Sequence, residues 1–173
     1  MEFFDVIKRR RSIRSYMKRE MSQEMIEALI EAARWAPSAG NIQPWEFVIA
    51  TDQNVKSNLS HAAYKQKDLE EASIVIVVCA DQSRAEQAYG ERGKNLFCIQ
   101  DTAAAVENIL LTAVSMGLGS CWIGAFKEDQ IRKVINAPPH IKPVALIPVG
   151  YPNEPTNARE RRPLKEIIHK ERF

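Results

Sequence analysis

We predict from the sequence an α+β sandwich in which helices pack on a central sheet. Three observations support this fold class. Short β-branched runs alternate with segments of helical apolar period along the 173-residue chain. One run, residues 74–80, is apolar throughout, as expected of a central strand that is covered on both faces. One long helical segment, residues 95–116, is mostly apolar and should be nearly surrounded by protein.

The first half of the chain should form three helices and one strand. The spacing of apolar side chains predicts a short helix over residues 2–9. Ser22 is a good N-cap for the second helix, which Pro37 ends. Residues 45–51 are typical of a strand, and residues 52–63 are typical of a third helix.

The second half should complete the sheet around the central strand. Residues 121–125 and 144–150 are apolar and β-branched enough to add two more strands. A short helix is expected between them, at about residues 128–135. The tail after Pro152 is polar and can hardly form a core of its own, although a short helix after Pro163 is expected.

The composition is that of a folded protein, and we expect residues 1–173 to form one domain. Apolar residues make up 45% of the chain and charged residues 27%, both ordinary values. Early acidic residues interrupt any secretory leader, and no apolar run reaches the length that spans a membrane. Three widely separated cysteines match no zinc spacing and no disulfide framework. We therefore expect a cytoplasmic protein without a metal site.

The charged residues are distributed unevenly. Residues 8–19 hold seven basic residues and no acidic one, and residues 159–172 hold six basic and three acidic ones. The rest of the chain has 11 basic and 19 acidic residues, and the formal net charge is only +2. Solvated faces or a nucleic-acid groove would explain such basic segments, but the acidic body would repel a long polyanion. A small anion held between the two ends of the chain fits better.

The sequence contains no familiar hydrolytic or metal motif. The G-x-S-x-G elbow, the H-E-x-x-H helix and the phosphate-binding P-loop are all absent. The three histidines are scattered and have no ligand spacing. A protein without clusters of acid, base or nucleophile can take its chemistry from a cofactor.

Three local patterns favour a flat ligand that carries negative charge. Alternate side chains of an extended segment share one face, so Arg10, Ser12 and Arg14 could offer two guanidinium groups and a hydroxyl to one ligand. The loop at residues 36–45 carries amide side chains that can read a heterocycle edge. Gly124 would let the backbone approach a flat ligand closely. A turn or a solvated face would explain each pattern taken alone.

Taken together, these patterns resemble the nitroreductase family of FMN flavoproteins. The resemblance covers essentially the whole chain, with the motifs in the order RRRSIR, PSAGNIQPW, IVIVVCAD, IQDTAAAVENILLTAVSMGLGSCWIGAF and VALIPVGYP, followed by the basic tail. It implies a mostly antiparallel central sheet flanked by helices. It also implies one FMN per active site, NADH or NADPH as reductant, and a homodimer whose two sites are each built from both subunits.

The resemblance also assigns cofactor-binding residues. The segment that holds the FMN phosphate, ribityl chain and pyrimidine edge would be Arg10, Arg11, Ser12 and Arg14. The loop contributed by the other subunit would be Pro37, Ser38, Ala39 and Asn41. The segment against the isoalloxazine ring, with a backbone N–H at N5, would be Ile123, Gly124 and Ala125, and a further residue near the ring would be Gln66. The basic pair that returns to the phosphate would be Arg161 and Arg162.

Two features depart from the family pattern. Ala39 stands where relatives often have a second serine, which removes one hydroxyl contact. Only residues 82–94 separate the core strand from the long helix, where larger relatives place extra helices over the substrate. We expect either a shorter lid there, or Tyr89 and its neighbours covering the substrate alone.

The function that the resemblance implies is that of an FMN-dependent oxidoreductase. Hydride would pass from NADH or NADPH to flavin N5 and then to a small oxidised acceptor, such as a nitroaromatic or a quinone, in a ping-pong cycle. The flavin supplies the chemistry, so no catalytic acid or base is named, and Arg14 is the candidate for a positive charge near N1 and O2. One alternative is a specialised relative, either a dehalogenase or a flavin-fragmenting enzyme. Another, from a different class, is a nucleic-acid-binding module that uses both basic ends.

Overall fold

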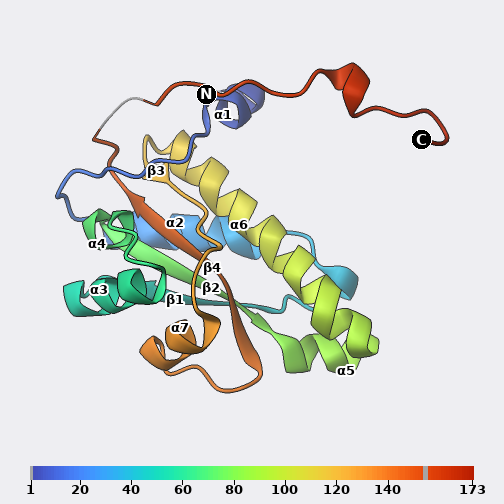
Figure 1. Cartoon of the computed structure of the whole chain (residues 1–173), viewed down its shortest axis with the longest axis horizontal. Helices are drawn as coiled ribbons and strands as arrows, with labels where there is room; N and C mark the ends of the chain where they lie inside the picture. Colours follow the sequence, from blue (N-terminus) through green and yellow to red (C-terminus); the bar gives the residue numbers. More distant parts are fainter. Residues whose placement is uncertain (1, 154–155) are drawn as a thin grey trace.

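A four-stranded antiparallel sheet forms the centre of the protein (Figure 1). The computed structural model describes residues 2–153 and 156–173. The strands lie across the sheet in the order β1-β2-β4-β3. Their bounds are Trp45–Ala50 (β1), Ile74–Asp81 (β2), Gly119–Ser120 (β3) and Ile141–Gly150 (β4). The expected α+β fold with an antiparallel central sheet is thus confirmed.

Strand β2 lies inside the sheet and is buried at every residue except its last, Asp81. Its side chains at Ile74, Ile76 and Val78 join one apolar cluster, whereas those at Val75 and Val77 join a second cluster. Successive side chains of a strand point to opposite faces, so the two clusters lie on the two sides of the sheet. This explains why residues 74–80 are all apolar, as expected from the sequence.

Helices cover both faces of the sheet and form three layers with it. The first cluster includes residues of α2 (Gln23–Arg34) and α6 (Cys98–Ser115). The second includes residues of α3 (Gln53–Ala62), α4 (Asp68–Glu71) and α7 (Glu128–Val134). The short helix α4 has no counterpart in the sequence prediction, because four residues are too few to show a period.

Helix α2 begins and ends where the sequence predicts. The Ser22 hydroxyl accepts a hydrogen bond from the backbone N–H of Met25 at 3.4 Å, which satisfies one of the free donors of the first turn. Leu29 and Ala33 are fully buried on the face turned to the core. The helix ends at Arg34, before Pro37.

The long helix predicted at residues 95–116 is joined to a second helix that the sequence analysis missed. Helix α5 (Gln82–Arg92) follows β2 directly and continues through one π-helical turn, Gly93–Phe97, into α6. Asp81 caps α5, because its Oδ1 accepts the N–H of Arg84 at 3.0 Å. Residues 82–94 are therefore mostly helical, with a kink at Tyr89 and Gly90, whose backbone angles are not helical.

The combined helical run Gln82–Ser115 is long and apolar enough to cross a membrane by length and composition alone. It is the one run of that kind in the described ranges, and it corrects the expectation that no segment reaches this length. The core helix of a globular protein passes the same test, and buried residues of α6 such as Ile109 belong to the main apolar cluster. This run is therefore weak evidence for a membrane span.

The strand expected at residues 121–125 does not form, which corrects the sequence prediction. Strand β3 comprises Gly119–Ser120 alone, and beyond it Ile123 makes an isolated bridge with Leu146. Cys121 donates its N–H to the Pro148 carbonyl at 3.3 Å, but a proline has no N–H to donate in return. The ladder is interrupted at that point, and the segment continues as extended chain.

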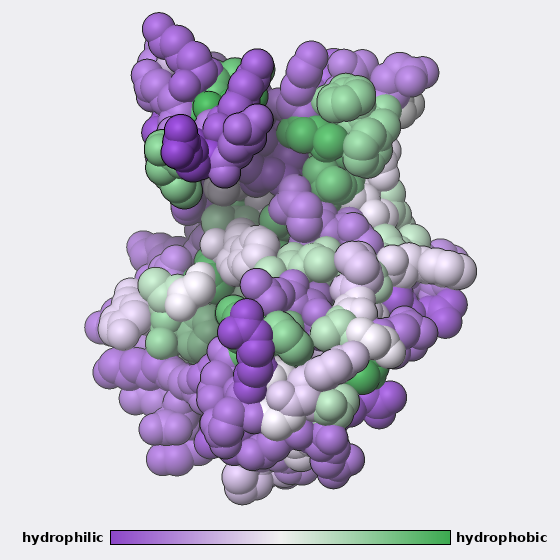
Figure 2. All heavy atoms as spheres, turned by 90° about the vertical axis from the view of Figure 1, so that its right-hand side faces the viewer, coloured by the Kyte–Doolittle hydropathy of each residue, from purple (hydrophilic) through white to green (hydrophobic). Residues whose placement is uncertain are grey.

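The segment that follows α1 and the first part of the tail meet at the top of Figure 1, and the tail then runs on past α1 to the C-terminus. Helix α1 spans Phe3–Arg9, as expected. The helix expected after Pro163 is only a short 3-10 turn, Leu164–Glu166, and the described tail residues 156–173 are exposed. Figure 2 shows apolar side chains at the surface of this upper part. The exposed large apolar residues of α1 and the tail are Phe3, Phe4, Ile7, Leu164, Ile167, Ile168 and Phe173.

Candidate functional site

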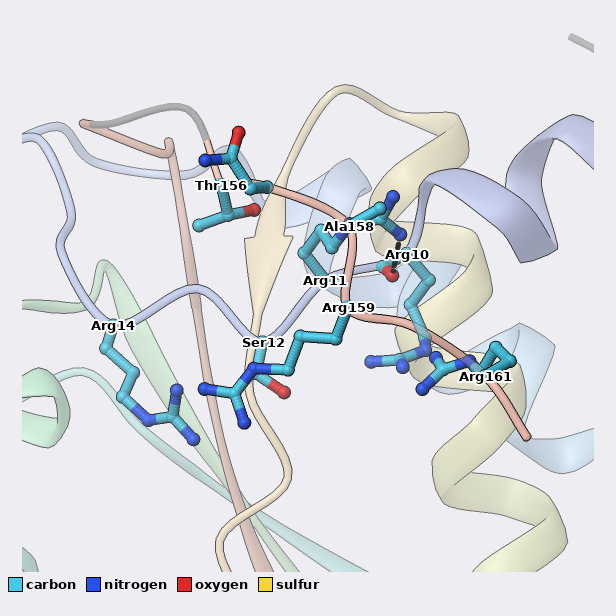
Figure 3. A pocket seen from close by; sticks show the side chains of 9 residues that line it. Arg10, Arg11, Ser12, Arg14, Thr156, Ala158, Arg159 and Arg161 are labelled. Atoms are coloured by element: carbon cyan, nitrogen blue, oxygen red, sulfur yellow. Dashed lines mark hydrogen bonds between the residues drawn. The ribbon is translucent and has the colours of Figure 1, made fainter.

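The N-terminal basic segment and the tail enclose a cavity of about 440 Å³ (Figure 3). Its lining residues are Arg10, Arg11, Ser12, Arg14, Thr156, Asn157, Ala158, Arg159 and Arg161. Five are arginines and none is acidic, so the cavity carries a strongly positive field. The two basic segments that are far apart in the sequence therefore meet, as the charge distribution predicted.

Residues 10–14 are fixed by the edge of the sheet. Ser12 forms a parallel bridge with Ser120, and the Ile13 N–H donates to the Ser120 carbonyl at 2.9 Å. A side chain at Gly119 would meet the Ile13 side chain at 2.8 Å, so glycine is needed for this close approach. The Tyr16 hydroxyl donates to the Ile13 carbonyl at 2.7 Å and ties down the far end. The segment is therefore extended, as the alternation argument assumed.

The extended backbone turns several arginines toward one space. In Figure 3 the side chains of Arg10, Arg14, Arg159 and Arg161 project to the same side of the two backbone segments. Arg11 differs from these, because its Nη1 donates to the carbonyls of Lys8 at 2.6 Å and Arg10 at 2.8 Å. The guanidinium of Arg11 is thus partly used within its own segment.

Of the two tail arginines named from the sequence, one lines the cavity and one does not. Arg161 lines the cavity as expected. Arg162 does not, because its Nη2 donates to the Glu166 carbonyl at 3.0 Å and its Nε lies 3.6 Å from the Glu166 carboxylate. Arg159, which the motif comparison passed over, lines the cavity instead. Arg159 could have been predicted from the sequence, because residues 159 and 161 of an extended tail have side chains on the same face.

The segment expected to face the flavin ring is partly exposed and is linked to Gln66. Ile123 is buried, whereas Gly124 and Ala125 are exposed. A Cβ at Gly124 would meet no atom within 4 Å, so the space beside this backbone is open. The Gln66 amide Nε2 donates to the carbonyls of Ala63 at 2.9 Å and Ala125 at 3.1 Å. The structure therefore brings Gln66 and this segment together.

The Arg14 charge at the cavity acts on two buried titratable groups near the segment at residues 123–125. Burial raises the pKa of the Asp68 carboxyl, and the nearby Arg14 charge partly opposes this rise. Burial likewise raises the pKa of the Cys121 thiol, again opposed by Arg14. Arg14 is thus close to α4 and to the residues just before Ile123. Burial also raises the pKa of Tyr16 far above its ordinary value, so this hydroxyl stays protonated.

The predicted loop at residues 37–41 lies apart from the cavity within one chain. Ser38 Oγ accepts the Gln43 N–H at 3.0 Å, and the Ala39 N–H donates to Asp101 Oδ1 at 3.1 Å. Gly40 and Asn41 have φ values of 53° and 56°, so the loop makes a left-handed turn. Neither Pro37, Ser38, Ala39 nor Asn41 lines the arginine cavity. The contribution of Asp101 was missed, because it depends on a contact between distant segments.

Clusters of metal-ligand side chains and reactive thiols would be two other sources of chemistry among the described residues. No group of three or more His, Cys, Asp or Glu side chains that could hold a metal ion is found among them. The three cysteines are buried and free, and burial raises the pKa of the Cys79 thiol to about 12. A buried thiol with so high a pKa is not a nucleophile at neutral pH.

Comparison with known proteins identifies the family of this chain. The sequence model of the nitroreductase family matches residues 7–68 and 56–151. A protein of Archaeoglobus fulgidus, provisionally named an NADH dehydrogenase/NAD(P)H nitroreductase, is 36% identical over 178 residues, which cover 99% of both chains. A Bacillus subtilis protein named FMN reductase (NADPH) is 29% identical over 98% of this chain and 73% of its own length.

Solved structures agree with the sequence comparison. The NfrA1 nitroreductase of B. subtilis superimposes with a TM-score of 0.89 at 28% identity, covering 98% of this chain and 74% of that one. A nitroreductase family protein of Clostridium novyi superimposes with a TM-score of 0.81 at 30% identity, covering 89% and 87%. The family model, the relatives and the fold all lead to the same assignment, and the chain belongs to the nitroreductase family of oxidoreductases.

Proposed function

We propose that this protein is an FMN-dependent NAD(P)H oxidoreductase that reduces a small oxidised acceptor such as a nitroaromatic or a quinone. The observation that carries the proposal is the meeting of Arg10, Arg14, Arg159 and Arg161 at one cavity. Guanidinium groups bind phosphate through paired, charge-assisted hydrogen bonds. The relatives add the nicotinamide reductant, and one of them is named for FMN.

The cavity fits the phosphate and ribityl part of FMN. Its volume of about 440 Å³ lies in the usual range for small-molecule sites. The lining contains no acidic side chain that would repel a phosphate, and the Ser12 hydroxyl can bond to a sugar-alcohol chain. Arg11 Nε is buried with no hydrogen-bond partner among the described residues.

The ring end of the flavin would lie along the exposed segment at Gly124 and Ala125. The open space beside Gly124 admits a flat ring close to the backbone. Gln66 fixes the Ala125 carbonyl through its Nε2, while its Oε1 has no protein donor among the described residues. An amide oxygen of this kind can accept a hydrogen bond from a heterocycle N–H.

The protein's share of the chemistry would be binding and electrostatics. Bound FMN supplies a ring that accepts hydride from NADH or NADPH at N5 and returns it to the acceptor, in a ping-pong cycle. Arg14 would hold a positive charge at the pyrimidine edge, where negative charge develops. No side-chain acid or base is required, and water can supply protons. We place the activity in one domain of residues 1–173, in the cytoplasm.

We further propose a homodimer with shared sites. The loop at residues 37–41 does not reach the arginine cavity of its own chain, so its proposed contact with flavin requires a second copy. The apolar side chains of α1 and the tail are exposed, and an obligate dimer interface would cover such a surface.

Reconstitution with FMN tests the proposed function. Purified protein should bind one FMN per chain, and NADH or NADPH should bleach the bound flavin in the absence of oxygen. A screen of nitroaromatic, quinone and halogenated acceptors would then separate a general reductase from a specialised dehalogenase. A colourless protein that fails to bind FMN and instead binds DNA with a steep salt dependence would overturn the proposal.

A further inference from the structure

The turn that follows α3 has a backbone conformation unusual for its residues. Tyr64 and Lys65 have φ values of 58° and 62°, in the left-handed region. The Lys65 N–H donates to the Ser60 carbonyl at 2.8 Å and closes the end of the helix. Glycine usually occupies such a position, because a Cβ is unfavourable there. Two successive residues with side chains in this conformation suggest that the side chains themselves are needed.

Hydrogen bonds hold this turn against the proposed flavin-ring segment. Gln66 connects the Ala63 and Ala125 carbonyls through its Nε2. The Lys127 N–H donates to the Ala62 carbonyl at 2.9 Å. The end of α3 and residues 125–127 are therefore tied at two points, and Tyr64 and Lys65, which lie between Ala62 and Gln66 in the sequence, are exposed.

The surface of the turn is aromatic and positively charged. The Tyr64 side chain is 62% exposed, and Lys127 Nζ lies 6.0 Å from the centre of its ring. Lys65 and Lys127 are exposed, and neither forms an ion pair within the described part of the chain. The acidic neighbour Glu128 is engaged by Arg132 and Lys142. The positive charge of the turn is thus not cancelled by that carboxylate, and Asp129 is the remaining acid next to it in sequence.

We propose that Tyr64, Lys65 and Lys127 form a docking patch for the phosphate groups of the nicotinamide nucleotide. The inference rests on the proposed function, because a nicotinamide that reaches the ring segment must leave its diphosphate on neighbouring surface. Lysine ammonium groups bind phosphate as point charges, and an exposed tyrosine ring offers a face for a planar base. These residues are separate from those of the arginine cavity.

The decisive experiment compares two reductants on the FMN-loaded enzyme. NADH carries a diphosphate, whereas 1-benzyl-1,4-dihydronicotinamide donates the same hydride without any phosphate. Lys65→Ala combined with Lys127→Ala should raise the KM for NADH about two- to thirtyfold, as expected for two exposed charge contacts. The KM for the phosphate-free reductant should not change. Binding of NAD⁺ to the oxidised enzyme, measured by calorimetry, should weaken by the same factor and lose most of its salt dependence.

Two further variants separate docking from structure. Lys133→Ala removes an equally exposed charge from α7 and should leave both reductants unaffected. Tyr64→Gly relieves the left-handed backbone, so it should raise the Tm by a few degrees while still weakening NAD⁺ binding. Affinity for FMN should stay constant in every variant.

Each outcome decides the matter. Equal changes with both reductants, or none with either, would overturn the docking patch while leaving the proposed function intact. If the Lys65→Ala and Lys127→Ala variant raised the KM only for anionic aromatic acceptors, the patch would bind the acceptor. That result would also overturn the patch as a nucleotide site. If neither reductant bleaches the FMN of the wild-type enzyme, the proposed function and the patch are both wrong.

Discussion

Replacing Arg159 and Arg161 by alanine should weaken FMN binding and leave riboflavin binding almost unchanged. Both side chains line the arginine cavity, and a hydrogen bond to a charged group contributes about 1.5–3 kcal/mol. Both residues are exposed, so solvent screening reduces their joint contribution to about 2–3 kcal/mol. The Kd for FMN should therefore rise about 30- to 150-fold. Riboflavin lacks the phosphate and should bind as before.

Fluorescence titration of the flavin-free protein with both ligands measures this contrast. Arg162→Ala is the matched control, because it removes the same charge from the same tail but breaks a contact with Glu166. Its Kd for FMN should change little. Equal weakening of FMN and riboflavin would indicate general damage to the fold. A larger loss from the Arg162 change than from the Arg159 and Arg161 pair would refute the assignment of the cavity to phosphate.

Three other predictions follow from the structure. Sedimentation of the FMN-loaded protein at micromolar concentration should show a dimer, and a flavin-loaded monomer would contradict the shared site. Gly40→Ala should lower the free energy of unfolding in urea by about 1–3 kcal/mol, because Gly40 has φ +53° and the new Cβ would lie 2.1 Å from the Tyr89 hydroxyl oxygen. Adding Tyr89→Phe removes that oxygen and should restore part of the lost stability. Burial raises the pKa of Asp68, so the folded state keeps this proton longer than the unfolded state and loses stability as pH rises above about 4. Urea unfolding across pH should therefore show Asp68→Asn gaining stability relative to wild type as pH rises, and a constant difference would contradict the shifted pKa.

The parts of the fold that the sequence predicts are those fixed by local patterns. Strand β2 is apolar from Ile74 to Ala80 because both faces are covered, and α2 carries its own start signal in Ser22. Residues 121–125 have the same apolar character, but their pairing depends on Pro148 of the neighbouring strand, which a local pattern does not reveal. Helix α5 was missed because its polar composition and Gly90 resemble a connection, although Asp81 is a clear cap.

The candidate site also has parts that the sequence predicts and parts that depend on tertiary packing. Alternation along residues 10–14 brings Arg10 and Arg14 to one cavity, and the charge distribution anticipates that the tail closes it. The choice of Arg159 over Arg162 depends on the path of the tail. The hydrogen bond from the Ala39 N–H to Asp101 joins segments 62 residues apart and follows from tertiary packing alone.

Anaerobic titration of the FMN-reconstituted protein with NADH and with NADPH tests the central claim most directly. At least one nucleotide should bleach the flavin with one equivalent per bound FMN, and a quinone added afterwards should restore the yellow colour. A flavin that stays oxidised with both nucleotides would contradict the assignment of the protein as an FMN-dependent NAD(P)H oxidoreductase.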